Sequence, residues 1–274
     1  METSGVRSLI ESLSSATAEH ADERMHALVN ANRPDVRYLV ARVCGSAALP
    51  IAAVCAAVLA EAGAPTGILD AEPRLPTGPL DDALYERAGR LALSAAYQLG
   101  LQRPELGECS RREIEVTLAL TAFAEASMRV VLLVEERPGS DAPMNAVGAD
   151  ISVFGRLTME QVEVALALLP DGRPLIAAPQ EDAVLGRVEA VATDRALPLL
   201  LGGRDFTAED VAGGSDVIVA GERYAALPRG EHVEGWILAT GIAAALGVGA
   251  LGVRMRSEWV VAGAREAARR TMSP

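Results

Sequence analysis

Residues 41–50 have the order of a strand, a loop and the start of a helix, an arrangement that often binds phosphate. Gly45 and Ser46 provide a glycine and a hydroxyl, and Ala48 and Pro50 follow at the expected helix start. A phosphate-binding loop needs glycine N–H groups, a lysine for the phosphate oxygens and a Ser or Thr hydroxyl for Mg²⁺. The chain contains no lysine, and all 25 of its basic residues are arginine. This loop therefore has the glycine and the hydroxyl of a nucleotide-binding loop but not its positively charged lysine.

A pair of acids, Glu135 and Glu136, ends a second apolar run. Carboxylates at the end of a strand can hold Mg²⁺, so Glu135 is the candidate metal ligand of the chain. A solvated strand end is the interpretation that we favour. On that interpretation, neutralising Glu135 should change stability by no more than about 0.5 kcal/mol.

Histidine and cysteine give no further site. The three histidines are too scattered for zinc, and the acids Asp81 and Asp82 are better placed to start a helix than to hold a metal. The cysteines are odd in number, lack C-x-x-C spacing and lie in or near apolar runs, at Cys44, Cys55 and Cys109. This pattern predicts reduced, buried thiols in a cytoplasmic protein, and the acidic N-terminal segment has no secretory signal.

The elements that must position these residues alternate along the chain. Periodicity predicts an N-terminal helical segment at 6–31, and aliphatic runs predict buried strands at 38–44, 66–69, 130–135, 151–154, 175–178, 197–200 and 217–220. Further helices are predicted at 50–62, 80–99, 111–127, 158–169, 181–194, 232–246 and 257–270. Strands that alternate with helices predict an α/β fold with a mostly parallel, doubly wound sheet, whose sites form at the carboxyl ends of its strands.

Charge and hydropathy exclude two classes of partner. The net charge of −12 argues against nucleic acid, because binding a phosphate backbone requires a concentrated basic surface. The uncharged run 236–253 reaches the length of a membrane span, but its glycines indicate a buried helix, so we expect no membrane association. Within it, Gly247, Gly249 and Gly252 match G-x-G-x-x-G, yet they follow a predicted helix. Glycines at a helix end, leading into a short strand, are the better interpretation.

Several motifs in a shared order resemble those of the Mur ligase superfamily, and within it folylpolyglutamate synthase. Residues 43–51 resemble the loop V-x-G-T-N-G-K-G-S-T, and residues 114–125 resemble F-E-v-T-t-A-l-A-F-x-x-F-A-E. Weaker echoes follow at 128–145, 169–176, 203–206 and 232–235. The resemblance implies the fold of the Mur ligase central domain and a reaction that joins an acid to an amino acid with ATP and Mg²⁺.

The chain departs from that pattern where the chemistry is done. The resemblance places the loop lysine at Ala48 and the magnesium-binding hydroxyl at Pro50. It places a metal-binding histidine at Thr158 and the lysine that the superfamily carbamylates at Ala165. Of these ligands, only the glutamate is kept, as Glu135.

Arginine is the remaining source of positive charge. Arg74 stands where the family has P-H-L, and Arg137 and Arg156 also follow predicted strands. A guanidinium binds phosphate bidentately and could replace a lysine, although salt-bridged surface arginines are commoner. The family's C-terminal ligase domain is expected to be missing, since only about one helix follows Val253.

These observations favour a catalytically degenerate relative of folylpolyglutamate synthase that acts as a binding or partner subunit, with no cofactor. One alternative is an ATP-dependent amide ligase, or a subunit of one, using Mg²⁺. Another is a non-catalytic protein that binds a pterin or a nucleotide. We expect a helical segment at 1–34, a central α/β domain at 35–253 and a C-terminal helix at 254–274. Aliphatic surface near residues 47–51 and the late helices should be exposed, which predicts a homodimer or a ligase-like partner chain.

Overall fold

A computed structural model describes residues 5–13, 19–32, 38–139, 141–230 and 233–271. The helices among them are α1 (Gly5–Glu11), α2 (Ala21–Asn32), α3 (Ala48–Glu61), α4 (Asp82–Gln102), α5 (Arg111–Glu125), α6 (Ala142–Asn145), α7 (Met159–Ala167), α8 (Asp182–Asp194), α9 (Gly235–Ala250) and α10 (Ser257–Thr271), with a 3₁₀ turn η2 (Pro104–Leu106). The strands are β1 (Leu39–Cys44), β2 (Thr66–Leu69), β3 (Pro73–Leu75), β4 (Gly78–Pro79), β5 (Val130–Glu135), β6 (Ile151–Phe154), β7 (Leu175–Ala177), β8 (Leu199–Leu201), β9 (Phe206–Val211), β10 (Gly214–Val219) and β11 (Glu222–Leu227).

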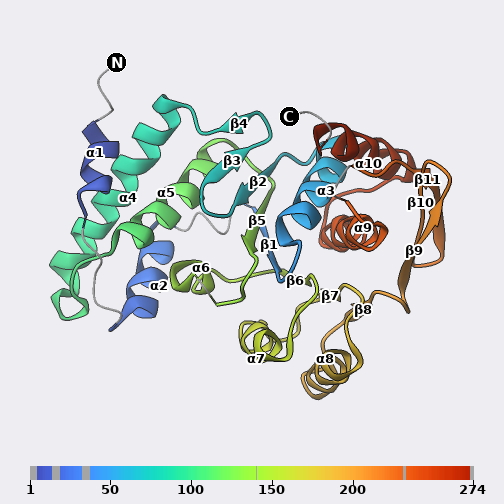
Figure 1. The fold of residues 1–274 in the computed structure, drawn as a ribbon. Helices are drawn as coiled ribbons and strands as arrows, with labels where there is room; N and C mark the ends of the chain where they lie inside the picture. Colours follow the sequence, from blue (N-terminus) through green and yellow to red (C-terminus); the bar gives the residue numbers. More distant parts are fainter. Residues whose placement is uncertain (1–4, 14–18, 33–37, 140, 231–232, 272–274) are drawn as a thin grey trace.

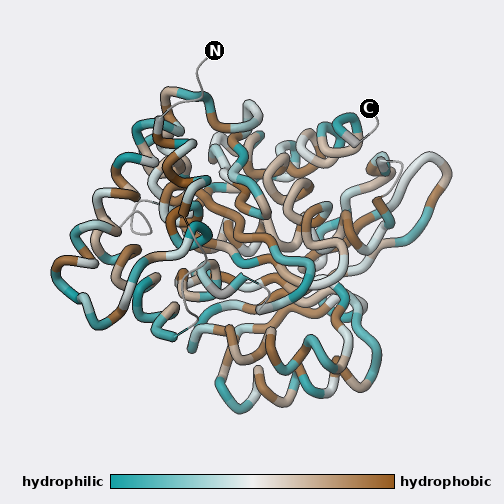
Figure 2. The backbone as a smooth tube through the Cα atoms, turned by 60° about the vertical axis from the view of Figure 1, so that its left-hand side comes forward, coloured by the Kyte–Doolittle hydropathy of each residue, from teal (hydrophilic) through white to brown (hydrophobic). Residues whose placement is uncertain are grey.

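An eight-stranded sheet runs through the molecule in the order β4-β3-β2-β5-β1-β6-β7-β8. The six strands from β2 to β8 in this order pair in parallel, and β3 and β4 add an antiparallel edge. The strands of its centre are hydrophobic, as the brown segments in the middle of Figure 2 show. The mostly parallel, doubly wound α/β fold predicted from the sequence is confirmed.

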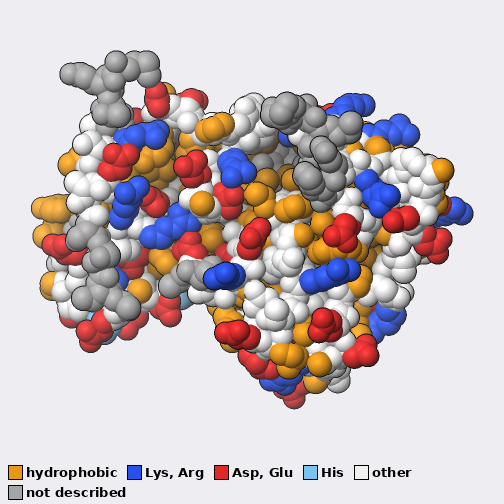
Figure 3. All heavy atoms as spheres, in the orientation of Figure 1, with side chains coloured by type: hydrophobic (Ala, Val, Ile, Leu, Met, Phe, Trp, Pro, Cys, Tyr) orange, Lys and Arg blue, Asp and Glu red, His pale blue; other side chains and the backbone are white. Residues whose placement is uncertain are grey.

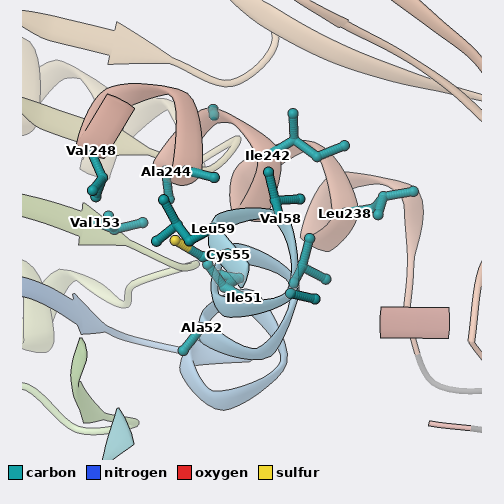
Figure 4. Close-up of a cluster of buried hydrophobic side chains, with 14 of the residues drawn as sticks. Ile51, Ala52, Cys55, Val58, Leu59, Val153, Leu238, Ile242, Ala244 and Val248 are labelled. Carbon is teal, nitrogen blue, oxygen red and sulfur yellow. The ribbon is translucent and has the colours of Figure 1, made fainter. Parts of the chain in front are cut away.

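One face of this sheet is covered by α3 and α9, with α10 outside α3 (Figure 1). Ile51 and Val58 of α3 lie against Leu238 and Ile242 of α9 in a core of small and branched aliphatic side chains (Figure 4). The two helices approach closely because Gly241 has no side chain; a Cβ there would lie 2.6 Å from Cβ of Val54. Ala48 and Ile51 are buried, the other residues of 47–51 are half-buried, and α9 is mostly buried. The expectation of exposed aliphatic surface at 47–51 and α9 is therefore wrong.

The opposite face carries α2, α4, α5 and α6, and α7 and α8 cover it beneath β6, β7 and β8. The N-terminal helices join this layer through a buried ion pair. Nε of Arg24 in α2 lies 3.1 Å from Oε1 of Glu113 in α5, and both side chains are 1% exposed. Glu113 also completes a capping box with Ser110 at the start of α5. The helical N-terminal segment is thus part of the packed domain.

A second sheet lies beside the first, with the antiparallel order β11-β10-β9. The run at 217–220 was predicted as a buried strand of the alternating series, but it belongs to β10 of this separate sheet. The hairpin of β3 and β4 was not predicted. Helix α9 continues through Gly247 and Gly249 to Ala250 without a following strand, so the short strand expected there is wrong, while the buried helix is confirmed.

Among the described residues, no helix has the length and hydropathy needed to cross a membrane.

Candidate functional site

A cleft of about 500 Å³ lies at the carboxyl ends of β2 and β5, beside the start of α3. Its charged lining comes from β2, α5, β5 and the loops beside them: Asp70 after β2, Arg112 in α5, Glu135 and Glu136 at the end of β5, and Asp141 before α6. This is the edge at which a parallel α/β sheet binds its ligands. The sequence analysis named Glu135 and Glu136 from this set and missed Arg112, Asp70 and Asp141.

Glu135 is buried, with its side chain 2% exposed, so the interpretation as a solvated strand end is wrong. Its Oε2 lies 3.5 Å from NH1 of Arg42, and its Oε1 accepts the N–H of Asp141 at 2.9 Å. Its carbonyl also accepts the N–H of Gly45 at 3.0 Å. Both carboxylate oxygens are thus used inside the protein, and removing them would leave a buried cation without its counter-ion.

Arg42 is the partner that the sequence analysis did not single out. It lies in the middle of β1, in an otherwise apolar run, and its side chain is 3% exposed. NH1 donates to the side chain of Asn145 at 2.8 Å, and NH2 donates to the carbonyls of Met144 and Val147 at 3.0 Å. Burial lowers the pKa of Arg42 from its ordinary value, and Glu135 opposes that shift. A charged residue inside a predicted buried strand was the signal that could have revealed this pair.

Arg112 forms hydrogen bonds to both sides of the cleft. Its Nε donates to Oδ2 of Asp141 at 2.7 Å, and its NH1 and NH2 donate to the carbonyls of Ala71 and Asp70 at 3.1 and 2.9 Å. Arg74, predicted at the nucleotide site, pairs at 2.8 Å with the Asp70 carboxylate from the edge strand β3 and is half exposed. Because these arginines already bind carboxylates and carbonyls, neither presents a free guanidinium for a phosphate.

Three backbone N–H groups of the loop between β1 and α3 donate to carbonyls of the chain. The N–H of Gly45 donates to the carbonyl of Glu135, that of Ser46 to the carbonyl of Arg156 at 2.9 Å, and that of Ala48 to the carbonyl of Gly45 at 3.1 Å. Phosphate-binding loops use such N–H groups to hold oxygen atoms. In this loop they hold carbonyls of the chain itself.

The segment 155–157 lies directly on the loop. A Cβ on Gly155 would lie 2.1 Å from the carbonyl oxygen of Ser46, and one on Gly45 would lie 2.7 Å from Cδ2 of Leu157. Leu49 adds an aliphatic side chain to the cleft. No residue from 45 to 51 is basic, so the absence of a cation does not depend on which of them is matched with the lysine.

The structure separates the other positions taken from the resemblance. Ala48 begins α3 and is buried, whereas Pro50 lines a small crevice against the loop before α9 and against α10. Thr158 caps α7, where its hydroxyl accepts the N–H of Gln161, and Ala165 is buried between α7 and α8. None of these four residues lines the cleft. These four positions therefore lie apart from the cleft that Glu135 lines.

The two remaining arginine candidates lie on the surface. Arg137 is exposed after β5, and the guanidinium of Arg156 stacks on the ring of Trp236 with its Cζ 4.4 Å from the centroid. A planar guanidinium on an aromatic face is a stable arrangement in its own right.

The described cysteines and acidic side chains indicate neither a reactive thiol nor a metal site. Burial raises the pKa values of Cys44 and Cys55 to about 12 and that of the half-buried Cys109 to about 11, so these thiols stay protonated at neutral pH. Among the described residues, no three His, Cys, Asp or Glu side chains are grouped as metal ligands. His232, which carried one of the weaker motif echoes, lies outside the described residues.

Comparison with known proteins finds similarity in structure only. No family model matches the sequence. No curated protein matches it either. Among solved structures, a folylpolyglutamate synthase complex with AMPPCP and folate superposes with a TM-score of 0.84 at 16% identity, covering 97% of this chain and 72% of that one. Folylpolyglutamate synthetase from Lactobacillus casei gives 0.81 at 18% identity, with the same coverage.

A third similar structure, the Mycobacterium tuberculosis folylpolyglutamate synthase complexed with ADP, gives a TM-score of 0.79 at 16% identity. It is matched over 95% of this chain and 64% of its own length. At these identities the likeness establishes the fold, and function must be argued from the residues. The chain has the fold of the folylpolyglutamate synthases, as the motifs at 43–51 and 114–125 predicted.

Proposed function

We propose that this protein is a catalytically degenerate relative of folylpolyglutamate synthase that acts without ATP, as a binding or partner subunit. The observation that carries the proposal is the loop at residues 45–48, in which the N–H groups of Gly45, Ser46 and Ala48 donate to carbonyls of the chain itself. Phosphoryl transfer depends almost entirely on positioned charges and donors around the phosphates. This loop has no lysine, and three of its backbone donors are already used.

The state of Glu135 supports the same proposal. Its carboxylate is bonded to Arg42 and to the N–H of Asp141. Taking Mg²⁺ would require it to leave a buried guanidinium, and uncompensated buried charges cost several kcal/mol. The ligand kept from the family's set thus has a structural partner of its own.

A second candidate, a pterin or other small polar ligand held without turnover, is favoured by the cleft itself. Its volume of about 500 Å³ falls in the range of small-molecule sites, and its lining places Arg112 between Asp70 and Asp141. Folate is bound in one of the similar structures, which makes it the first probe to try. Under this candidate the protein would bind the ligand and release it unchanged.

The decisive experiment measures nucleotide binding by thermal shift and calorimetry, with Lactobacillus casei folylpolyglutamate synthetase as the positive control. A ligand at 100 times its Kd stabilises a protein by about 2.7 kcal/mol, which is readily detected. We expect no shift with millimolar Mg-ATP. A saturable, Mg²⁺-dependent shift that disappears in Ser46→Glu would place a nucleotide at this loop and favour the ATP-dependent ligase. Ser46 is exposed, so this variant should fold normally.

Folate and simpler pterins are tested in the same assay against Leu49→Glu, which adds a charge to the cleft. Binding that is lost in this variant and retained in Ser46→Glu would support the small-ligand candidate. If neither ligand class binds, co-purification from the native host tests the partner role. Recovery of an intact ligase-like chain is the result expected for a partner subunit that joins a larger enzyme.

A further inference from the structure

Arg42 has one hydrogen-bond donor that the described part of the chain does not use. A guanidinium carries five N–H donors. In Arg42, NH1 donates to the side chains of Asn145 and Glu135, and NH2 donates to the carbonyls of Met144 and Val147. The fifth donor, at Nε, is buried and has no partner among the described residues. Figure 3 shows other arginine side chains at the surface, where water satisfies such donors, but Arg42 as a whole residue is 2% exposed.

A second buried polar atom without a partner lies in β6. Ser152 is 1% exposed, and its hydroxyl has no hydrogen bond to any described residue. Its backbone N–H is used, since it donates to the carbonyl of Pro174 at 3.0 Å. A buried hydroxyl without a hydrogen bond costs free energy, and such groups in folded proteins are nearly always satisfied by the protein or by an ordered water.

These two residues are direct neighbours in the sheet. Strands β1 and β6 pair in parallel, and their register places Arg42 opposite Ser152. Side chains alternate between the two faces of a sheet, and residues opposite one another point to the same face. The residues on either side of the pair belong to the core beneath α3 and α9: Ala41, Val43, Ile151 and Val153. Arg42 and Ser152 therefore both point to the opposite face.

On that face the pair lies where two hydrophobic clusters meet. Leu133, opposite Arg42 in β5, belongs to the cluster that includes residues of α2 and α5. Leu175, opposite Ser152 in β7, belongs to the cluster that includes residues of α7 and α8. Apolar side chains offer no hydrogen bond. Because Nε and the hydroxyl are not bonded to each other either, a molecule between them is the remaining way to satisfy both.

We propose that one buried water molecule bridges Nε of Arg42 and Oγ of Ser152. The water would accept the N–H of Nε and donate one of its hydrogens to Oγ. Its size suits a bridge between neighbouring strands, because such strands lie about 4.8 Å apart and the two hydrogen bonds of one water span about the same distance. Buried waters typically hold together polar groups that the chain itself leaves unsatisfied.

The charges around Arg42 favour a neutral occupant. NH1 of Arg42 lies 3.5 Å from the carboxylate of Glu135, which would repel an anion drawn to the same guanidinium. The guanidinium in turn would repel a metal ion or an ammonium ion. A molecule larger than water would have to displace the apolar side chains around the pair. Water is neutral, small and able both to accept and to donate.

The bridge would link β1 to β6 in the middle of the sheet and complete the hydrogen bonding of Arg42. It would thereby help to hold the guanidinium against Glu135 at the carboxyl edge of the strands. This inference rests on the interior of the sheet, and it does not depend on whether the loop at 45–48 binds a nucleotide.

A high-resolution crystal structure of the unmodified protein tests the proposal directly. We expect one ordered water within about 3.2 Å of both Nε of Arg42 and Oγ of Ser152. A direct hydrogen bond between these two atoms would overturn the proposal, and so would a map that shows no water between them.

Oxygen-17 relaxation dispersion, which detects long-lived buried waters in solution, gives a second test. Ser152→Val removes the hydroxyl and fills the space beside it, so the number of long-lived waters should fall by one. Thr121→Val is the matched control, because Thr121 is also buried but its hydroxyl donates to the carbonyl of Thr117 at 2.8 Å within its own helix. This control should leave the number unchanged.

Circular dichroism establishes that both variants fold, and the crystal structure of the unmodified protein decides the question if Ser152→Val does not. An unchanged number of long-lived waters in folded Ser152→Val would contradict the proposal. Equal losses in the two variants would contradict it as well, because the water lost would not be one that belongs to Ser152.

Discussion

Two neighbouring strand ends at the same edge of the sheet differ sharply in their chemistry. At the end of β1, the loop is aliphatic, and its N–H groups donate to carbonyls of the chain. At the end of β5, Glu135 is joined to Arg42 and Asp141, and Arg112 joins Asp141 to the residues after β2. The loop after β1 carries no charged residue, while the end of β5 carries charges that are paired within the chain. Charged residues at the carboxyl ends of strands can thus contribute to the stability of the fold.

The largest effect expected from this comparison is at Glu135. Removing its carboxylate in Glu135→Ala leaves Arg42 buried without its counter-ion, and we expect a loss of about 3–5 kcal/mol in the free energy of unfolding. Denaturant titration measures the loss. Glu136→Ala is the control, because Glu136 is exposed and should change stability by less than about 0.5 kcal/mol. Equal effects of the two substitutions would show that the pair contributes nothing to folding.

The second largest effect is expected where residues 155–157 pack against the loop after β1. Added volume there should lower the free energy of unfolding nearly as much. In Gly155→Ala the new methyl group would lie 2.1 Å from the carbonyl oxygen of Ser46, a backbone atom that cannot move aside cheaply. Overpacking of this kind typically costs about 1–3 kcal/mol, and we expect a value near 3. Gly148 has open space around it, so Gly148→Ala serves as the control. A thermal scan that places both variants at the wild-type Tm would mean that the loop and residues 155–157 are not in contact.

Arg112 should contribute less, because it is only partly buried. Arg112→Ala removes bonds to Asp141 and to the carbonyls of Asp70 and Ala71, and bonds of charged groups contribute about 1.5–3 kcal/mol. We expect a loss of about 2 kcal/mol by urea titration. Arg111 is its exposed neighbour on the same helix and pairs with Glu115, and Arg111→Ala should cost clearly less than Arg112→Ala, because exposed ion pairs contribute little. The opposite ranking would contradict the assigned role of Arg112 in the cleft.

The smallest effect is a difference in thiol reactivity. Burial raises the pKa of Cys44, at the end of β1, to about 12 and that of the half-buried Cys109 to about 11. Because the thiolate is the reactive form, alkylation of the native protein at pH 8 should be slow at both, with Cys109 modified first. Mass spectrometry of peptides after timed exposure to iodoacetamide gives the order. Rapid modification of Cys44 would show that the end of β1 opens to solvent.

The same pKa values predict how stability depends on pH. A thiol whose folded pKa is raised holds its proton longer in the folded state than in the unfolded chain. Its contribution is therefore complete below an unfolded pKa near 9 and is lost as pH rises towards 12 for Cys44 and Cys55. Substituting Cys55 by alanine should flatten the decline in Tm above pH 9. An unchanged slope would mean that other groups govern alkaline unfolding.

The sequence by itself determined the alternation of strands and helices, and hence the parallel sheet. Local signals suffice for such elements: aliphatic runs form the central strands, Asp81 and Ser110 cap α4 and α5, and Gly247 lies in a helix too apolar to be exposed. The sequence also showed that the loop at 45–50 has no lysine, and the resemblance placed Pro50 where the family has its magnesium-binding hydroxyl. Both conclusions, the fold class and the absence of these charges, can be read from short stretches of the sequence.

Only the tertiary structure decided which charges were buried and with what partners. Glu135 and Arg42 are 93 residues apart, and Asn145 is 103 residues from Arg42, so no local pattern reveals that they meet. The loop between β1 and α3 is covered by Gly155 and Leu157, which follow β6 and lie against it. Strand 217–220 joined a separate sheet because pairing partners, unlike strand propensity, are chosen over long distances. Burial and pairing depend on what the rest of the chain brings into contact, and that information is absent from any single segment.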